Sequence, residues 1–311
     1  MIDSRWQKLA AGVSVVAASC VFVLVAAPAA QAVSRCKNFV PGANLSRCDL
    51  KRANLSGKNL TGANLARANL TLANVSKAKL AGTNLYNANL SGANLDQVSS
   101  GGIKGAPHVL PTHWQVVRGY LVGPTANLAA AKFSGAPLGY ADLARANLTG
   151  ADMRHAKLGH ANLTHATLDN AILFDTVLAG TNLSGADLKG ADLSFATGDN
   201  TNLADASLVD ANLNGTSLGD AILTGADLAG ANAPGADLSW ADFTGDNLAG
   251  ANFSQATLTG ATLNQTNLTG SDLDRAILGQ ALLSSVTWSN TTCPDGTNSN
   301  SDADTCVNNL G

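Results

Sequence analysis

The sequence contains no glutamate, and all 22 of its acidic side chains are aspartate. Charged residues make up 13% and aromatic residues 5% of the 311 positions, so side chains suited to binding or catalysis are sparse. The lack of glutamate excludes paired-glutamate acid–base catalysis and the HExxH zinc motif. The sequence also has no phosphate-binding loop and no recognisable nucleophile–base arrangement. We therefore expect a protein that is not an enzyme and that binds no cofactor and no metal.

Leucine returns every five residues over most of the chain, as in residues 186–193 (ADLKGADL). Each unit has a small residue, then Asn or Asp, then Leu, then two polar or small residues. A helix turns about 100° per residue and a strand alternates every two, so neither would bury this leucine on one side. The period fits a chain that bends once per unit, and Gly190 and Gly230 favour that bend at the second position after Leu. The sequence thus indicates a solenoid of short repeats.

The A(D/N)LXX pattern from Ala43 to about Leu283 resembles that of the pentapeptide-repeat proteins. The resemblance implies an all-β fold, a right-handed quadrilateral parallel β-helix with four units per coil. It also implies that Leu and the small residue two positions before it point inward, whereas the other three positions face solvent. Side chains twenty residues apart should then stack on one face of the helix.

The N-terminus is typical of an export signal. Residues 1–32 begin with Arg5 and Lys8, continue through an uncharged run from residue 9 to 27, and end in the small-x-small sequence Ala-Gln-Ala. We expect a signal peptide cleaved after Ala32 and a protein that is secreted or associated with the cell envelope. The alternative is an uncleaved membrane anchor through residues 9–30, because the apolar run is long enough to span a bilayer.

Four cysteines bracket the repeat region in an apparently exported chain. Cys36 and Cys48 lie at its start, and Cys293 and Cys306 lie beyond its end. Two local disulfides, Cys36–Cys48 and Cys293–Cys306, are the most plausible of the three pairings. Each pair lies where a solenoid needs its apolar end closed.

The leucine register divides the chain into segments. It runs without a shift from Leu45 to Leu95 and again from Leu128 to Leu283. Leu95 and Leu128, however, are 33 positions apart, which is not a multiple of five. We therefore predict a signal peptide (1–32), an N-terminal cap with the first pentapeptide array (33–97), an insert (98–125), a second pentapeptide array (126–288) and a disulfide-closed C-terminal tail (289–311).

The insert contains a predicted hairpin, in which two apolar runs flank Arg118-Gly119. Residues 110–124 (LPTHWQVVRGYLVGP) resemble inserts of exported actinobacterial pentapeptide-repeat proteins. One interpretation is a projecting binding loop that carries His108, His113, Trp114 and Tyr120. The other is a plug or flap packed on the coil, which its apolar content favours.

Charge is distributed unevenly along the chain. Residues 33–132 carry twelve Lys or Arg and two Asp, a net charge of +10, whereas residues 190–311 carry one Arg and fourteen Asp, a net charge of −13. The basic start would attract an anionic envelope polymer, and opposite ends could attract each other head to tail, so we expect a monomer or weak head-to-tail association. An acidic rod also suits the DNA-mimicking, topoisomerase-binding members of the family, but an exported protein would not meet gyrase.

Two groups of residues are candidate contact sites. The twenty-residue register places His155 beside Asp175 and Asp175 beside Phe195, with Phe174 adjacent, and the insert contributes Trp114 and Tyr120. The three histidines 155, 160 and 165 would point from three different faces and therefore would not share a metal ion.

Two aspartate features leave alternatives open. Asp246 occupies an inward position of the repeat, where a carboxylate is costly, and we expect a local distortion there rather than a satisfied contact. The Asp-rich loop between Cys293 and Cys306 is more consistent with a solvated loop than with a calcium site, because it lacks the expected Gly and distal Glu.

We therefore expect an exported, non-enzymatic β-helical scaffold that presents a surface for interaction with a protein or with the cell envelope, and no nucleic acid. The alternative is a DNA-mimicking topoisomerase- or gyrase-binding pentapeptide-repeat protein, which requires that the chain is not exported.

Overall fold

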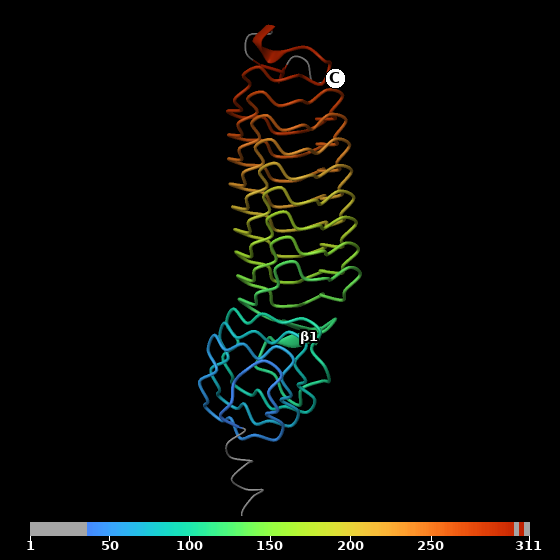
Figure 1. Cartoon of the computed structure of the whole chain (residues 1–311). Coiled ribbons are helices and arrows are strands. Elements are labelled where there is room, and N and C mark those ends of the chain that lie inside the picture. Colours follow the sequence, from blue (N-terminus) through green and yellow to red (C-terminus); the bar gives the residue numbers. More distant parts are fainter. Residues whose placement is uncertain (1–35, 302–304, 308–311) are drawn as a thin grey trace, which may run out of the picture.

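The computed structural model describes residues 36–301 and 305–307, and the predicted leader lies outside these residues. The chain winds into a long stack of coils (Figure 1). Parallel bridges join residues twenty positions apart, as between Asn64 and Asn84 or between Asp187 and Ser207, so each coil contains four five-residue units. The part of the chain that the structure describes contains no helix with the length and hydropathy of a membrane span.

The five-residue unit has a physical explanation in its hydrogen bonds. The amide of Leu65 donates to the carbonyl of Asn84 in the next coil (2.8 Å), and the amide of Asn84 donates back to Ala63 (2.9 Å). The side chain of Asn64 accepts a hydrogen bond from the amide of Ala66 (3.1 Å) and so closes the turn that follows Leu. Arg67 then takes a positive φ of 59°, which bends the chain into the next face.

The inside of the coil is filled by leucine and by the small residue two positions before it. Leu188 and Ala186, for example, are both buried. Where threonine takes the small position, its hydroxyl donates to a carbonyl, as Thr181 Oγ1 does to Leu158 (2.9 Å). These inward threonine hydroxyls are therefore hydrogen-bonded. Most of the core is a narrow column of leucine side chains.

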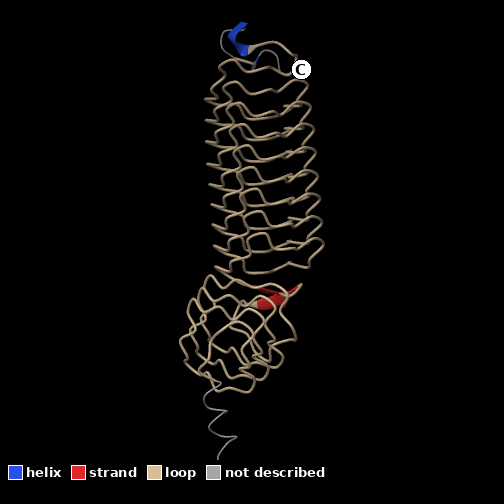
Figure 2. Ribbon diagram, in the orientation of Figure 1, coloured by secondary structure: helices blue, strands red, loops and turns tan. Residues whose placement is uncertain are grey.

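A short hairpin lies at the junction of the two arrays. Strand β1 (Gln115–Val117) pairs antiparallel with β2 (Tyr120–Val122), and Val116 is opposite Leu121. Figures 1 and 2 show this hairpin between an N-terminal stack of coils and a longer C-terminal stack that is tilted against it.

Coil geometry continues for some distance after the repeat pattern has ended. Lys79 pairs with Ser99 and Asn89 with Val109, although residues 98–109 lack the leucine pattern. Ser99 then pairs with Asn127, eight residues further than the usual twenty. The hairpin therefore occupies a gap between two stacks that share one continuous side.

The hairpin is packed into the core and does not project from the coil. Val117 and Val122 belong to the apolar core of the second array, whereas Leu121 belongs to the core of the first. Trp114 packs against both cores. The hairpin is therefore a plug that joins the two cores, which supports the packed interpretation of this segment over the projecting loop.

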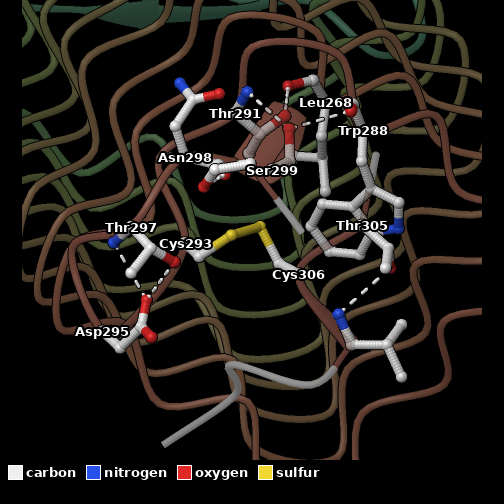
Figure 3. Close-up of a disulfide and its surroundings, with 12 residues drawn as sticks. Leu268, Trp288, Thr291, Cys293, Asp295, Thr297, Asn298, Ser299, Thr305 and Cys306 are labelled. Atoms are coloured by element: carbon white, nitrogen blue, oxygen red, sulfur yellow. Dashed lines mark hydrogen bonds between the residues drawn. A yellow bond between two sulfur atoms is a disulfide. The ribbon is translucent and has the colours of Figure 1, made fainter. Parts of the chain in front are cut away.

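Disulfides close both ends of the described rod. Cys36 is bonded to Cys48 (S–S 2.01 Å), and Cys293 to Cys306 (2.02 Å), the two local pairings that the sequence favoured. At the C-terminal end, the 3₁₀ helix η1 (Ser299–Ser301) begins with the buried Ser299. Its hydroxyl donates to the carbonyl of Trp288 (2.9 Å), as Figure 3 shows. The tail thus covers the last coil.

Asp246 does not distort the coil, so the expected distortion is wrong. The adjacent Asn247 keeps its bridges to both Asp227 and Asn267. Asp246 is only 1% exposed, and its Oδ1 accepts a hydrogen bond from the amide of Ala226 (3.0 Å). Its Oδ2 has no hydrogen-bond partner. Burial raises the pKa of this carboxyl to about 8.

Candidate functional site

The predicted contact patch around His155 comes together on one edge of the second array. His155 Nδ1 lies 2.8 Å from Asp175 Oδ2 in the next coil. Both side chains are more than half exposed, so the pair adds only a small amount to stability, less than about 1 kcal/mol. The ring of His155 meets the ring of Phe174 edge to face at 5.8 Å, and Phe174 meets Phe195 at 5.7 Å.

This His155 patch combines an exposed charged pair with two aromatic rings. Phe195 is 50% exposed, which is unusual for a phenylalanine in a soluble protein. In the same unit as His155, Arg154 donates two hydrogen bonds of 2.9 Å to Asp152. This side-chain hydrogen bonding lowers the pKa of Asp152, so the aspartate remains ionised. The patch is an amphipathic surface that suits a protein partner.

The hairpin aromatics form a separate group. The ring of Tyr120 packs on the ring of Phe133 (5.0 Å), and its hydroxyl accepts a hydrogen bond from the amide of Lys132 (3.2 Å). Tyr120 is therefore mainly part of the plug. Trp114 is half-buried like Tyr120, but it also lines a groove with Tyr140.

The three histidines are distributed over three edges, as the repeat register implied. His155 is in the patch, whereas His160 stacks on Tyr140 of the preceding coil with ring centroids 5.0 Å apart. His165 packs over Gly185 of the next coil. Across residues 36–301 and 305–307, no group of three His, Cys, Asp or Glu side chains is placed to hold a metal ion.

A second groove lies in the basic first array. Arg47 and Arg67 occupy the same edge of successive coils and line the groove with Tyr86. The guanidinium of Arg67 lies over the Tyr86 ring, 5.9 Å from its centroid. Neither arginine forms an ion pair with a described residue. The groove therefore presents two unneutralised guanidinium groups, which suit a carboxylate or phosphate.

The sequence analysis did not predict that Tyr140 stacks on His160, or that Arg47 and Arg67 line one groove. Both pairs are twenty residues apart, so the signal that placed His155 beside Asp175 was present for them too. The groove at Trp114 had no such signal, because the hairpin does not follow the repeat register.

The chain is a solenoid of four-unit coils whose candidate contact residues lie on its outer edges. The chain belongs to the pentapeptide repeat family. The family pattern, described as pentapeptide repeats in 8 copies, covers more than half of the chain, at residues 43–80, 68–99, 126–164, 156–194, 206–245 and 247–284.

Several solved structures resemble the chain. HetL, a pentapeptide repeat protein involved in heterocyst differentiation regulation from the cyanobacterium Nostoc, is 26% identical, with 79% of this chain and 93% of that chain covered and a TM-score of 0.38. QnrB1, a plasmid-mediated fluoroquinolone resistance protein, is 18% identical, with 76% and 86% covered and a TM-score of 0.31.

A pentapeptide repeat protein from the thylakoid lumen of Arabidopsis thaliana is 35% identical over a shorter part, with 31% of this chain and 63% of that chain covered and a TM-score of 0.21. No curated protein matches the chain.

Proposed function

We propose that this chain is an exported, non-enzymatic β-helical scaffold that presents its surface to a protein or to an anionic polymer of the cell envelope. The observation that carries the proposal is the disulfide at each end of the rod, Cys36–Cys48 and Cys293–Cys306. Disulfides form and persist outside the reducing cytosol, so they favour export through a leader cleaved after Ala32. Retention of residues 9–30 as an anchor would leave the rod at the cell surface.

Two surfaces support the binding role. The His155 patch offers exposed rings beside a charged pair, which suits a protein partner. The groove between Arg47 and Arg67 offers two cations on successive coils, which suits a polymer with regularly spaced anionic groups. The excess of acidic residues at the other end would favour weak head-to-tail contact between copies, with the monomer as the main species.

The test is disulfide mapping of the protein isolated from its host. Cells are lysed in the presence of a thiol-blocking reagent, and peptides are analysed without reduction. The proposal predicts linked peptides for Cys36–Cys48 and Cys293–Cys306 and no blocked thiol at these positions. Blocked free thiols at all four positions would mean that the protein resides in a reducing compartment and would refute export.

The acidic C-terminal third favours a second candidate function, a DNA-mimicking topoisomerase or gyrase binder. Residues 190–311 carry fourteen Asp and a single Arg. This function requires an intracellular protein with reduced cysteines. A DNA supercoiling assay with purified gyrase tests it, and inhibition at stoichiometric amounts of the protein would favour this function over the scaffold.

A further inference from the structure

A groove lies where the hairpin meets the second array. His113, Trp114 and Gln115 contribute one wall, and Tyr140 and Asp142 contribute the other. Its volume is about 290 Å³. Small-molecule pockets begin at about 300 Å³, so the groove suits one ring-sized group rather than a large ligand. We call it the hairpin groove.

Both aromatic walls of the hairpin groove are held in place. Tyr140 is 80% exposed, yet its ring stacks on His160 with an angle of 22° between the planes. His160 is not among the residues that line the groove, so it contacts Tyr140 without occupying the groove. Trp114 packs closely over Gly123, where a Cβ would collide with the indole. Contacts within the protein therefore orient both rings of the groove in the absence of a ligand.

The polar groups of the groove include both donors and acceptors. Asp142 Oδ1 accepts hydrogen bonds from the amide of Ala144 (3.2 Å) and from Asn162 Nδ2 (3.1 Å). Its Oδ2 faces His113, whose Nδ1 is 3.8 Å away. The Gln115 amide adds a further donor and acceptor. A carboxylate, an imidazole and an amide therefore surround the aromatic surfaces.

We propose that the hairpin groove binds one ring of a neutral saccharide. A sugar ring has an apolar C–H face, which packs on Tyr or Trp, and hydroxyl groups that both donate and accept hydrogen bonds. A cationic ligand would use only the ring faces and the acceptors. It would leave the N–H donors of His113 and Gln115 without a partner, whereas a saccharide hydroxyl can use both donors and acceptors. The proposal rests on the proposed binding role of the scaffold and specifies one class of ligand for it.

The test uses the disulfide-bonded protein immobilised for surface plasmon resonance. The probes are soluble tetrasaccharides of glucose, galactose, mannose, arabinose and N-acetylglucosamine, with tetramethylammonium as a cationic probe. At least one saccharide should bind, and Tyr140→Ala should weaken its binding by about tenfold or more, the loss of a stacked aromatic contact. His160→Ala should weaken it less, since His160 only positions Tyr140.

Trp240→Ala is the matched control. Trp240 is 58% exposed and occupies the same edge one hundred residues, or five 20-residue coils, after Tyr140. The Trp240→Ala variant should bind the saccharide with the affinity of the wild type. The proposal would be overturned if Tyr140→Ala and Trp240→Ala lost the same saccharide affinity, or if no saccharide bound at all. Binding of tetramethylammonium alone, in a manner that depends on Tyr140, would also overturn it and would assign a cation site instead. Disulfide mapping of the host protein is independent of these binding results, so it tests the proposed export separately from the proposed saccharide binding.

Discussion

Replacing Asp246 by alanine takes a carboxyl group out of the core of the second array. The side chain is 1% exposed, one oxygen accepts the Ala226 amide, and the other has no partner. Burial disfavours the ionised form and raises its pKa to about 8. Inward positions twenty residues before and after are Ala226 and Thr266, so alanine suits the site.

The sign of the pH effect follows from proton binding. An aspartate in the unfolded chain releases its proton near pH 4, whereas folded Asp246 keeps it until about pH 8. Between these values the folded state binds one proton more, so the free energy of unfolding falls as pH rises, by up to about 1.4 kcal/mol per pH unit. The loss should accumulate to several kcal/mol and level off above pH 8.

The assay is urea denaturation of the wild type and of Asp246→Ala from pH 4.5 to 8.5. Near the acid end the two proteins should differ least. Towards pH 8 the variant should become more stable than the wild type, because it has no buried carboxyl to ionise. Asp220→Ala, at an exposed turn, controls for the general loss of one negative charge. Parallel pH profiles for the wild type and Asp246→Ala would show that the raised pKa of Asp246 does not govern the pH dependence of stability.

Two further predictions concern the repeat itself. Gly260 and Gly250 both have φ near +69°, but a Cβ at Gly260 would collide with Trp240, whereas one at Gly250 would meet nothing within 4 Å. Gly260→Ala should therefore destabilise the rod by about 1 kcal/mol more than Gly250→Ala in thermal unfolding, and equal melting temperatures would contradict this packing. Leu213→Asp should lower the melting temperature sharply, because it removes about 1.5–3 kcal/mol of apolar burial and buries a charge, whereas Asn200→Asp at an exposed turn should not.

The five-residue period was sufficient to predict a coil because each unit repeats the same short-range contacts. The twenty-residue register also predicted that His155 would meet Asp175 and that Phe174 would lie near Phe195, and both contacts are present. These predictions were possible because residues twenty positions apart lie next to each other on adjacent coils.

The turn conformation was only partly predictable. Gly was expected at the second position after Leu, but Trp240 and Tyr140 also adopt positive φ there. The rings of Trp240 and His160 lie over Gly260 and Gly180 of the next coil, which lack a Cβ. Contact with the neighbouring coil thus allows a conformation that local preference disfavours.

The hairpin groove could not be predicted from the sequence. Residues 110–124 suggested a hairpin, but its direction depends on how Leu121 and Val122 fill the gap between two cores. Trp114 and Tyr140 line the same groove only as a result of that packing, and no periodic spacing in the sequence relates them. Asp246 was misjudged because one hydrogen bond and the neutral form suffice to keep it inside a regular coil.

Export of a disulfide-closed scaffold is tested by fractionating the host and measuring the intact mass of the protein in each fraction. An exported scaffold should be found in the medium or the wall fraction as a chain that begins at Val33, with its cysteines oxidised. A full-length chain with reduced cysteines in the cytosol would contradict it and would make gyrase inhibition the next assay.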